Sequence, residues 1–117
     1  MARLLELRLG PPGDALDRFE AAWNRLAEGR RPASLRVLTL EDLPALLRAL
    51  TPARWQLVSR LAKEGPLSIY ALAKRLERDY KNVHTDASEL LALGVLERRG
   101  KRAVAVPWDL LRAEMSL

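Results

Sequence analysis

A short cluster of positive charge is the part of the sequence whose chemistry is most specific. Arg98, Arg99, Lys101 and Arg102 flank a single glycine, Gly100. Repulsion among neighbouring cations destabilises a folded chain, whereas a polyanion that binds them releases its condensed counterions. Glycine also tolerates the positive φ that a tight hairpin needs. The spacing therefore predicts a basic hairpin tip that contacts phosphate groups.

A second group of polar residues precedes this tip. The stretch from Tyr80 to Leu93 predicts an amphipathic helix that Gly94 ends. Its polar side carries short side chains that can reach base edges in a major groove, and its N-terminus carries the positive end of the helix dipole. The candidate nucleic-acid contacts on this helix are Tyr80, Lys81, Asn82, His84, Thr85 and Ser88.

Two simpler interpretations compete with nucleic-acid binding. Charges at the tip 98–102 also protect edge strands from aggregation, and each polar position of the helix 80–93 is compatible with ordinary solvent exposure. His84 fits a phosphate contact or a surface position better than a pH switch. Because the tip and the helix are close in the sequence, we expect one contiguous basic surface.

The elements that must position these residues are predicted from local signals. Thr51-Pro52 starts a first helix, which Gly65 ends, and Ser68 caps a second, shorter helix. The polar run 77–79 has the length of the turn in a helix-turn-helix, and the helix 80–93 follows it.

The whole order of elements predicts an α+β, mostly helical fold. Residues 51–108 are expected to form a winged helix-turn-helix DNA-binding domain whose basic wing spans residues 97–103. Residues 1–50 are expected to form an N-terminal strand-helix-strand-helix extension. Residues 109–117 are expected to form a C-terminal helix with its leucines turned inward.

The N-terminal extension is predicted to mediate dimerisation. Leu5, Leu7 and Leu9 alternate with charged residues, as in a strand with one buried face. A helix is expected between residues 14 and 29, and a second strand begins near Leu35. Since a two-stranded sheet is marginal in water, we expect a second copy of the chain to cover its edges. The alternative is that this half packs on its own C-terminal half.

The apolar side chains on one side of each predicted helix are expected to face the protein core. The helix that Asp42 caps is predicted to turn its leucines inward. Trp23 and Trp55 stand at core spacings, which favours packing over the alternative of a small effector pocket.

Charge and composition exclude several classes of protein. Residues 1–50 hold 8 basic and 7 acidic side chains, and residues 51–117 hold 12 and 8, so the basic excess lies in the second half. A hydrophobic fraction of 49% with 30% charged residues argues against a membrane span and against disorder. Glu6 and Arg8 argue against a signal peptide. With no cysteine in the chain, cytoplasmic residence is the simplest expectation.

Residues for catalysis, cofactor binding or metal binding are not expected. The acidic pairs Asp14 with Asp17 and Glu41 with Asp42 fit helix N-termini. The serines have no predicted partner base, and the sequence contains no glycine-rich phosphate loop. A chain without cysteine and with one histidine cannot form a thiolate or His-rich metal site. We therefore expect a binding protein and not an enzyme.

Four runs of residues carry a family resemblance: Leu50–Trp55 with Leu57, Leu72–Leu76, Arg78–Asp86 and Leu90–Leu96. Over about residues 36–108 the chain resembles small prokaryotic winged helix-turn-helix transcriptional regulators of the broad MarR-like type, and in particular a compact, antitoxin-like group. The resemblance implies a homodimeric repressor that binds double-stranded DNA sequence-specifically. The alternative is a protein-interaction adaptor or antitoxin-like module on the same scaffold, with a partner such as a toxin.

Overall fold

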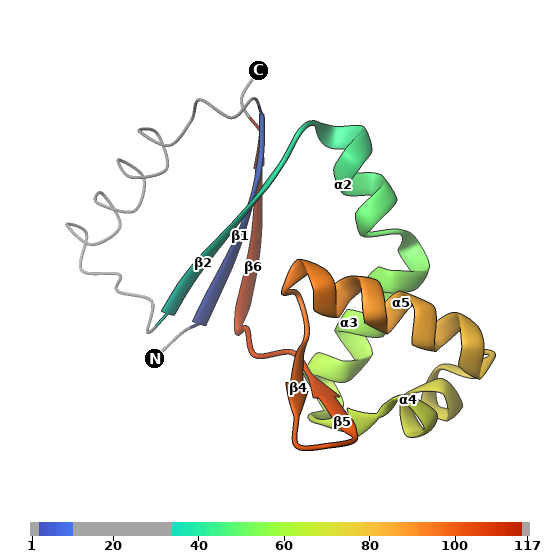
Figure 1. The fold of residues 1–117 in the computed structure, drawn as a ribbon. Coiled ribbons are helices and arrows are strands. Elements are labelled where there is room, and N and C mark those ends of the chain that lie inside the picture. Colours follow the sequence, from blue (N-terminus) through green and yellow to red (C-terminus); the bar gives the residue numbers. More distant parts are fainter. Residues whose placement is uncertain (1–2, 11–33, 116–117) are drawn as a thin grey trace. The chain divides into compact units, whose positions relative to one another are not determined.

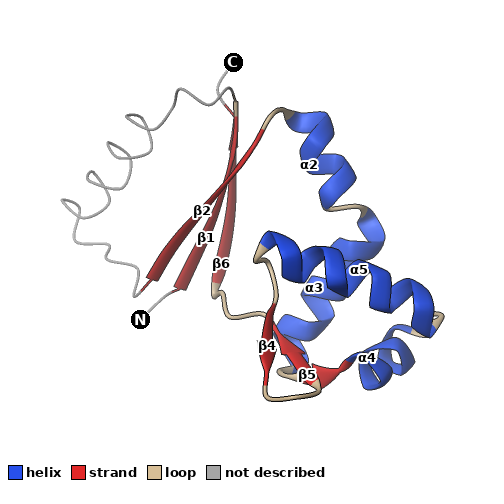
Figure 2. Cartoon of the chain, viewed as in Figure 1, coloured by secondary structure: helices blue, strands red, loops and turns tan. Residues whose placement is uncertain are grey.

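The computed structural model describes residues 3–10 and 34–115, and the chain divides into two compact units (Figure 1). The sheet unit comprises residues 1–46 and 108–117, and the helical unit comprises residues 47–107. Within the described residues the fold is α+β, with four helices and two three-stranded sheets (Figure 2). No helix in this part of the chain combines the length and the apolar character that a membrane span requires.

The sheet unit is built around its first strand. Its strands are β1 (Arg3–Leu9), β2 (Ser34–Leu40) and β6 (Leu110–Met115). Both neighbours run parallel to β1, in the order β2-β1-β6, so that Leu4 lies opposite Leu35 on one side and Leu110 on the other. Asp109 starts the second pairing, because its backbone N–H donates to the Arg3 carbonyl and its carboxylate accepts from the Arg3 N–H, both at 2.8 Å.

Two expectations for this unit are wrong, and a third concerns residues that the structure does not describe. The C-terminal helix expected within residues 109–117 is wrong, because residues 110–115 form β6, whose backbone pairs with β1. The single buried face expected for β1 is also wrong, since Leu4, Leu5 and Leu7 are all at most 4% exposed. A central strand is covered on both faces, which alternation alone does not reveal. The helix expected between residues 14 and 29 lies outside the described residues.

The origin of the third strand also changes the argument for dimerisation. The notion that a second copy must complete a two-stranded sheet does not hold, because β6 of the same chain lies beside β1. The predicted homodimer therefore needs other support.

The helices of the helical unit lie close to where the sequence predicts them. The α2 helix (Leu43–Ala49) spans the boundary between the units. The remaining elements are α3 (Pro52–Glu64), β3 (Leu67–Ser68), α4 (Ile69–Leu76), α5 (Tyr80–Leu93), β4 (Glu97–Arg99) and β5 (Ala103–Ala105). The three strands form an antiparallel sheet in the order β3-β5-β4 (Figure 2).

Side-chain caps fix where the helices of this unit begin. Thr51 Oγ1 accepts from the Arg54 N–H at 3.2 Å, and Ser68 Oγ accepts from the Ala71 N–H at 3.1 Å. Each bond satisfies an amide that has no partner within its own helix. Gly94 ends α5 in the left-handed conformation, with φ 84°. The predicted caps at Thr51 and Ser68 are confirmed.

The core of the helical unit consists of aliphatic side chains from all three helices. Leu57, Leu61, Leu72, Val83 and Leu90 are each 0% exposed. They recur at helical spacings, as the sequence predicts, and α3 and α4 both pack against α5. This packing fixes the side of α5 that faces away from the core.

Predicted core residues of both α2 and α3 are instead exposed. Trp55 is 47% exposed, because it lies at the edge of the buried face of α3, about 60° from Val58 but about 160° from Leu57 at about 100° per residue. The inward leucines predicted for α2 are also wrong, since Leu47 is 60% exposed and the helix has no buried residue. An apolar stripe predicts burial only where a facing surface exists.

Candidate nucleic-acid interface

The start of α5 and the β4–β5 hairpin face one hollow of about 290 Å³, which we call the hairpin hollow. The start of α4 contributes its remaining wall. The lining residues are Ser68, Ile69, Tyr70, Tyr80, His84, Arg98, Lys101, Arg102 and Val104. Three cations and three aromatic rings thus border one space, and no residue that lines it is acidic.

Hairpin geometry decides which cations reach this hollow. Arg98 lies opposite Val104 in the antiparallel register, and both line the hollow. Because side chains alternate along a strand, Glu97 and Arg99 share the other face, where Arg99 Nε donates to Glu97 Oε1 at 2.6 Å. Arg99 is therefore tied to a carboxylate and does not line the hollow.

A glycine turns the hairpin at its tip. Gly100 has φ +66°, the left-handed region, and it starts the loop that joins β4 to β5. The other two loop residues, Lys101 and Arg102, are exposed and line the hollow. The tight loop therefore presents its cations on the side that faces α5.

A second hollow of about 330 Å³ continues this surface along α5. It is lined by Tyr80, Lys81, His84 and Thr85, so it shares two residues with the hairpin hollow. The rings of Tyr80 and His84 lie 5.9 Å apart between centroids. The two shared side chains join the helix face and the hairpin into one surface.

The two remaining candidates on α5 lie outside both hollows. Asn82 and Ser88 are exposed, and the backbone N–H of Asn82 donates to Asp79 at 3.4 Å as part of the helix cap. Asn82 therefore lies on the first turn of α5, whose N-terminal amides are capped by the Asp79 carboxylate. All ten predicted contact residues are exposed.

Sequence reasoning missed one wall of the hairpin hollow. Tyr70 of α4 lines it and is 61% exposed, and its ring lies 4.7 Å from Lys74 Nζ. The available signal was its position two residues before Leu72, about 200° around α4 from that buried side chain.

An ion-pair cluster behind this surface fixes the orientation of α5. Asp86 Oδ1 accepts from Arg54 Nε of α3 at 3.0 Å, and Asp86 Oδ2 accepts from Arg78 Nη2 of the preceding turn at 2.8 Å. Arg54 Nη1 also donates to the Ala49 carbonyl at 3.2 Å. One carboxylate therefore connects α5 to α3 and to the turn that precedes α5. The run Arg78–Asp86 is one of those that carry the family resemblance, but the resemblance did not predict that Asp86 connects these elements.

The two arginines keep this carboxyl group ionised. Partial burial alone would raise the pKa of Asp86, but the hydrogen bonds from Arg78 and Arg54, together with their charges, more than offset burial and lower the pKa below its usual value. The side chain of Asp86 is only 15% exposed. The cluster is therefore charged at neutral pH, and it lies on the protein side of α5.

The sequence model of the HVO_A0114 family matches residues 49–113, more than half of the 117 residues, and the chain belongs to this family. No curated protein and no solved structure matches the chain. The matched range contains every residue of the two hollows and of the Asp86 cluster.

Proposed function

We propose that the protein is a sequence-specific regulator of transcription that binds double-stranded DNA through a winged helix-turn-helix. In this proposal α5 enters the major groove, and the β4–β5 hairpin is the wing that contacts the flanking backbone or minor groove. The observation that carries the proposal is the hairpin hollow, where Tyr80 and His84 of α5 face the same space as Lys101 and Arg102.

The electrostatics of this surface favour a polyanion. Arg98, Lys101 and Arg102 line the hollow without a carboxylate among the lining residues, so their charges are not neutralised there. Each phosphate that they contact would release condensed counterions.

Sequence preference would come from side chains that reach base edges. Asn82 suits adenine, because its amide group both accepts and donates hydrogen bonds. Lys81 and Thr85 can contact bases or phosphates without a steric obstacle. All three are exposed on the first two turns of α5. In this proposal the Asp86 cluster holds these turns at a fixed angle to the rest of the unit.

We include a homodimer in this proposal, because one winged helix binds only a half-site, and a dimer that binds two half-sites would occlude a promoter more effectively. Edge strand β6 supports it: Leu110 and Met115 are 48% and 46% exposed, and a second copy would cover such side chains.

Binding of a random pool of DNA duplexes to the purified full chain tests the proposal. The Lys101→Ala/Arg102→Ala variant should bind all sequences about tenfold more weakly at moderate salt, and its salt dependence should flatten by up to about 1.8 units of slope. The Arg60→Ala/Lys63→Ala variant removes two cations of the same unit outside the hairpin hollow and should bind like the wild type. Asn82→Ala should instead relax the preference among sequences.

Two results would contradict DNA binding at this site. One is the lack of any shift with the wild-type chain at low salt. The other is an equal loss in the two double variants, which would show that net charge and not the hairpin hollow determines binding.

A further inference from the structure

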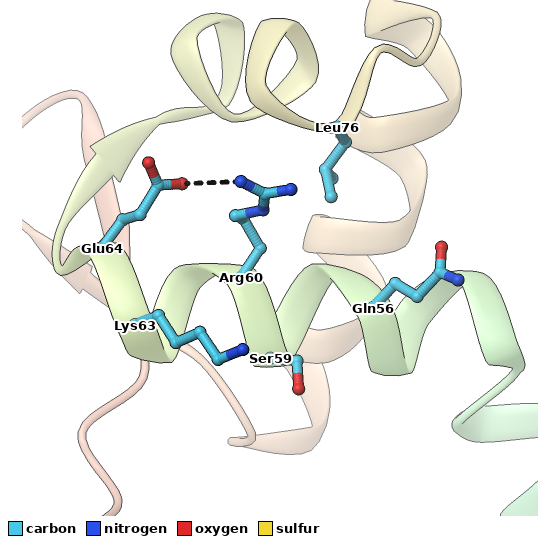
Figure 3. A pocket seen from close by; sticks show the side chains of 6 residues that line it. All are labelled: Gln56, Ser59, Arg60, Lys63, Glu64 and Leu76. Atoms are coloured by element: carbon cyan, nitrogen blue, oxygen red, sulfur yellow. Dashed lines mark ion pairs between the residues drawn. The ribbon is translucent and has the colours of Figure 1, made fainter.

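A larger hollow, of about 560 Å³, lies between the outer side of α3 and the end of α4 (Figure 3). We call it the α3–α4 hollow. It is lined by Gln56, Ser59, Arg60, Lys63, Glu64 and Leu76, and it shares no residue with the hairpin hollow. The proposed DNA contact uses none of these side chains.

Positive charge exceeds negative charge at this hollow. Arg60 Nη1 lies 4.0 Å from Glu64 Oε2, and Arg75 of α4 binds the other oxygen of the same carboxylate. Figure 3 shows the Arg60 side chain extending from α3 toward Glu64, with Leu76 on its other side. Lys63 joins neither ion pair. The lining residues therefore carry two cations and one carboxylate, a net charge of about +1, and Arg75, which is not among them, adds a third cation through its ion pair with Glu64.

The shared carboxylate orders the arginines without exhausting their donors. A guanidinium has five N–H donors, and one carboxylate has two oxygens to offer to both groups. The side chains of Arg60 and Arg75 remain 49% and 54% exposed, so donors on each stay accessible. Because Glu64 already restricts both side chains, an incoming carboxylate would meet partly preorganised partners and lose less side-chain entropy on binding.

The α3–α4 hollow differs in chemistry from the hairpin hollow. Its apolar wall is Leu76, its neutral polar groups are Gln56 and Ser59, and the exposed Trp55 lies one turn before Ser59 on the same helix. The hairpin hollow has aromatic rings and no carboxylate. A sugar-phosphate backbone carries regular charge and has no aliphatic group to place on Leu76. A protein segment can present acidic and aliphatic side chains at separate positions.

We propose that the α3–α4 hollow docks an acidic segment of a partner protein. Aspartate or glutamate side chains of that segment bind Arg60, Lys63 and Arg75, and an aliphatic side chain packs against Leu76 and Trp55. The proposal does not rest on DNA binding. Because the two hollows have no residue in common, the chain would hold such a segment and a duplex through different side chains.

A labelled peptide of repeated Glu-Glu-Leu units is the probe that tests this proposal. Fluorescence anisotropy with the full chain should show binding, and a Gln-Gln-Leu peptide should not bind. The Arg60→Glu/Lys63→Glu variant should bind the acidic peptide at least about tenfold more weakly, because each lost ion pair becomes a repulsion. The matched Lys101→Glu/Arg102→Glu variant should keep its affinity within about twofold.

The fold of the variants must be checked by circular dichroism. If Arg60→Glu/Lys63→Glu is misfolded, Arg60→Gln/Lys63→Gln replaces it, with an expected loss of about fivefold for the acidic peptide. Trp55→Ala should weaken peptide binding about threefold, because it removes the apolar contact and leaves the charge unchanged.

Three results would overturn the proposal. The first is the lack of binding of the acidic peptide to the wild-type chain at low salt. The second is an equal loss of peptide binding in the two charge-reversal variants, which would indicate unspecific attraction. The third is a loss of duplex binding, with peptide binding retained, in the Arg60→Glu/Lys63→Glu variant, which would assign the hollow to nucleic acid. A failure of duplex binding alone would contradict only the DNA proposal.

Discussion

The helical unit and the sheet unit connect their elements over very different distances along the chain. In the helical unit, α3, α4 and α5 follow one another with short turns, and the β4–β5 hairpin closes through the loop after Arg99. In the sheet unit, Leu4 lies beside Leu110, and the bond from Arg3 to Asp109 joins residues 106 positions apart. Local caps and turns thus position the candidate DNA surface, whereas the sheet depends on contacts between chain segments that are remote in sequence.

The sheet unit should show the largest single effect, at its central strand. Leu5→Ala removes a side chain that is 0% exposed between two parallel neighbours, so we expect a loss of about 2–5 kcal/mol in the free energy of unfolding. Urea denaturation measures this loss. Amide hydrogen exchange should show lower protection in β2 and β6 as well as in β1. Leu110→Ala makes the same change at a side chain that is 48% exposed and should cost less than about 1 kcal/mol. Equal losses would contradict a core centred on β1.

In the helical unit the next largest effect should come from the Asp86 cluster. Asp86→Asn leaves the guanidiniums of Arg54 and Arg78, 17% and 25% exposed, without their carboxylate, and we expect a loss of roughly 2–3 kcal/mol. Asp79→Asn makes the same chemical change at a helix cap, where asparagine caps equally well, and should change stability by less than about 0.5 kcal/mol. A loss for Asp86→Asn as small as the change for Asp79→Asn would contradict a stabilising role of the Asp86 cluster.

The same cluster predicts a pH dependence. Because Asp86 has a lower pKa in the folded chain than the ordinary value of 3.8, its stabilisation is fully present above that value and is lost as the pH falls through the folded-state pKa. The stability difference between wild type and Asp86→Asn should therefore stay constant from about pH 7 to about pH 5 and shrink below about pH 4. A difference that stays constant down to about pH 2 would contradict this assignment.

The turn between α3 and β3 tests how strictly the local backbone is specified. Gly65 has φ 85° and ψ −169°, and a Cβ at this position would meet nothing within 4 Å. Gly65→Ala should therefore act through backbone strain alone and cost about 1–3 kcal/mol in thermal or urea unfolding. Gly100→Ala, also in open space but at φ +66°, should cost about 1 kcal/mol. A larger loss at Gly100 than at Gly65 would contradict this ranking.

The smallest expected effect has the opposite sign. Glu77 caps α4 in the left-handed conformation, with φ 54° and ψ 45°, which a side chain makes unfavourable. Glu77→Gly should stabilise the chain by about 0.5 kcal/mol, because relief of strain exceeds the added entropy of the unfolded chain. Lys81→Gly, within α5, should instead destabilise by about 1 kcal/mol. A destabilised Glu77→Gly variant would indicate a contact that outweighs the strain.

The helical unit was predictable because its signals are local. Thr51, Ser68 and Gly94 mark helix ends through bonds and conformations that involve only nearby residues. The exposed side of α5 follows from the spacing of Val83, Ala87 and Leu90, which are buried as predicted. Local signals could not predict which face of β4 lines the hairpin hollow, because only the register with β5 places Arg98, and not Arg99, opposite Val104 in the lining.

The sheet unit was less predictable because its outcome depends on pairing across the chain. Leu110, Leu111 and Met115 are compatible with a helix, and only hydrogen bonds to β1 select the strand. The buried Leu4 on the second face of β1 depends on the same pairing. The ion pairs of Asp86 were missed for a related reason, since Arg54 lies 32 residues away in sequence.

The position of β6 after the helical unit has a consequence for protein synthesis. The ribosome makes β1 and β2 first, then the whole of residues 47–107, and only afterwards the strand that flanks β1 on its second side. During translation one hydrogen-bonding edge of β1 therefore stays unpaired until β6 is made, whereas the helices of residues 47–107 can already form. Completion of the sheet therefore requires prior synthesis of residues 47–107, and slow elongation through that range would prolong the interval in which nascent chains can associate wrongly.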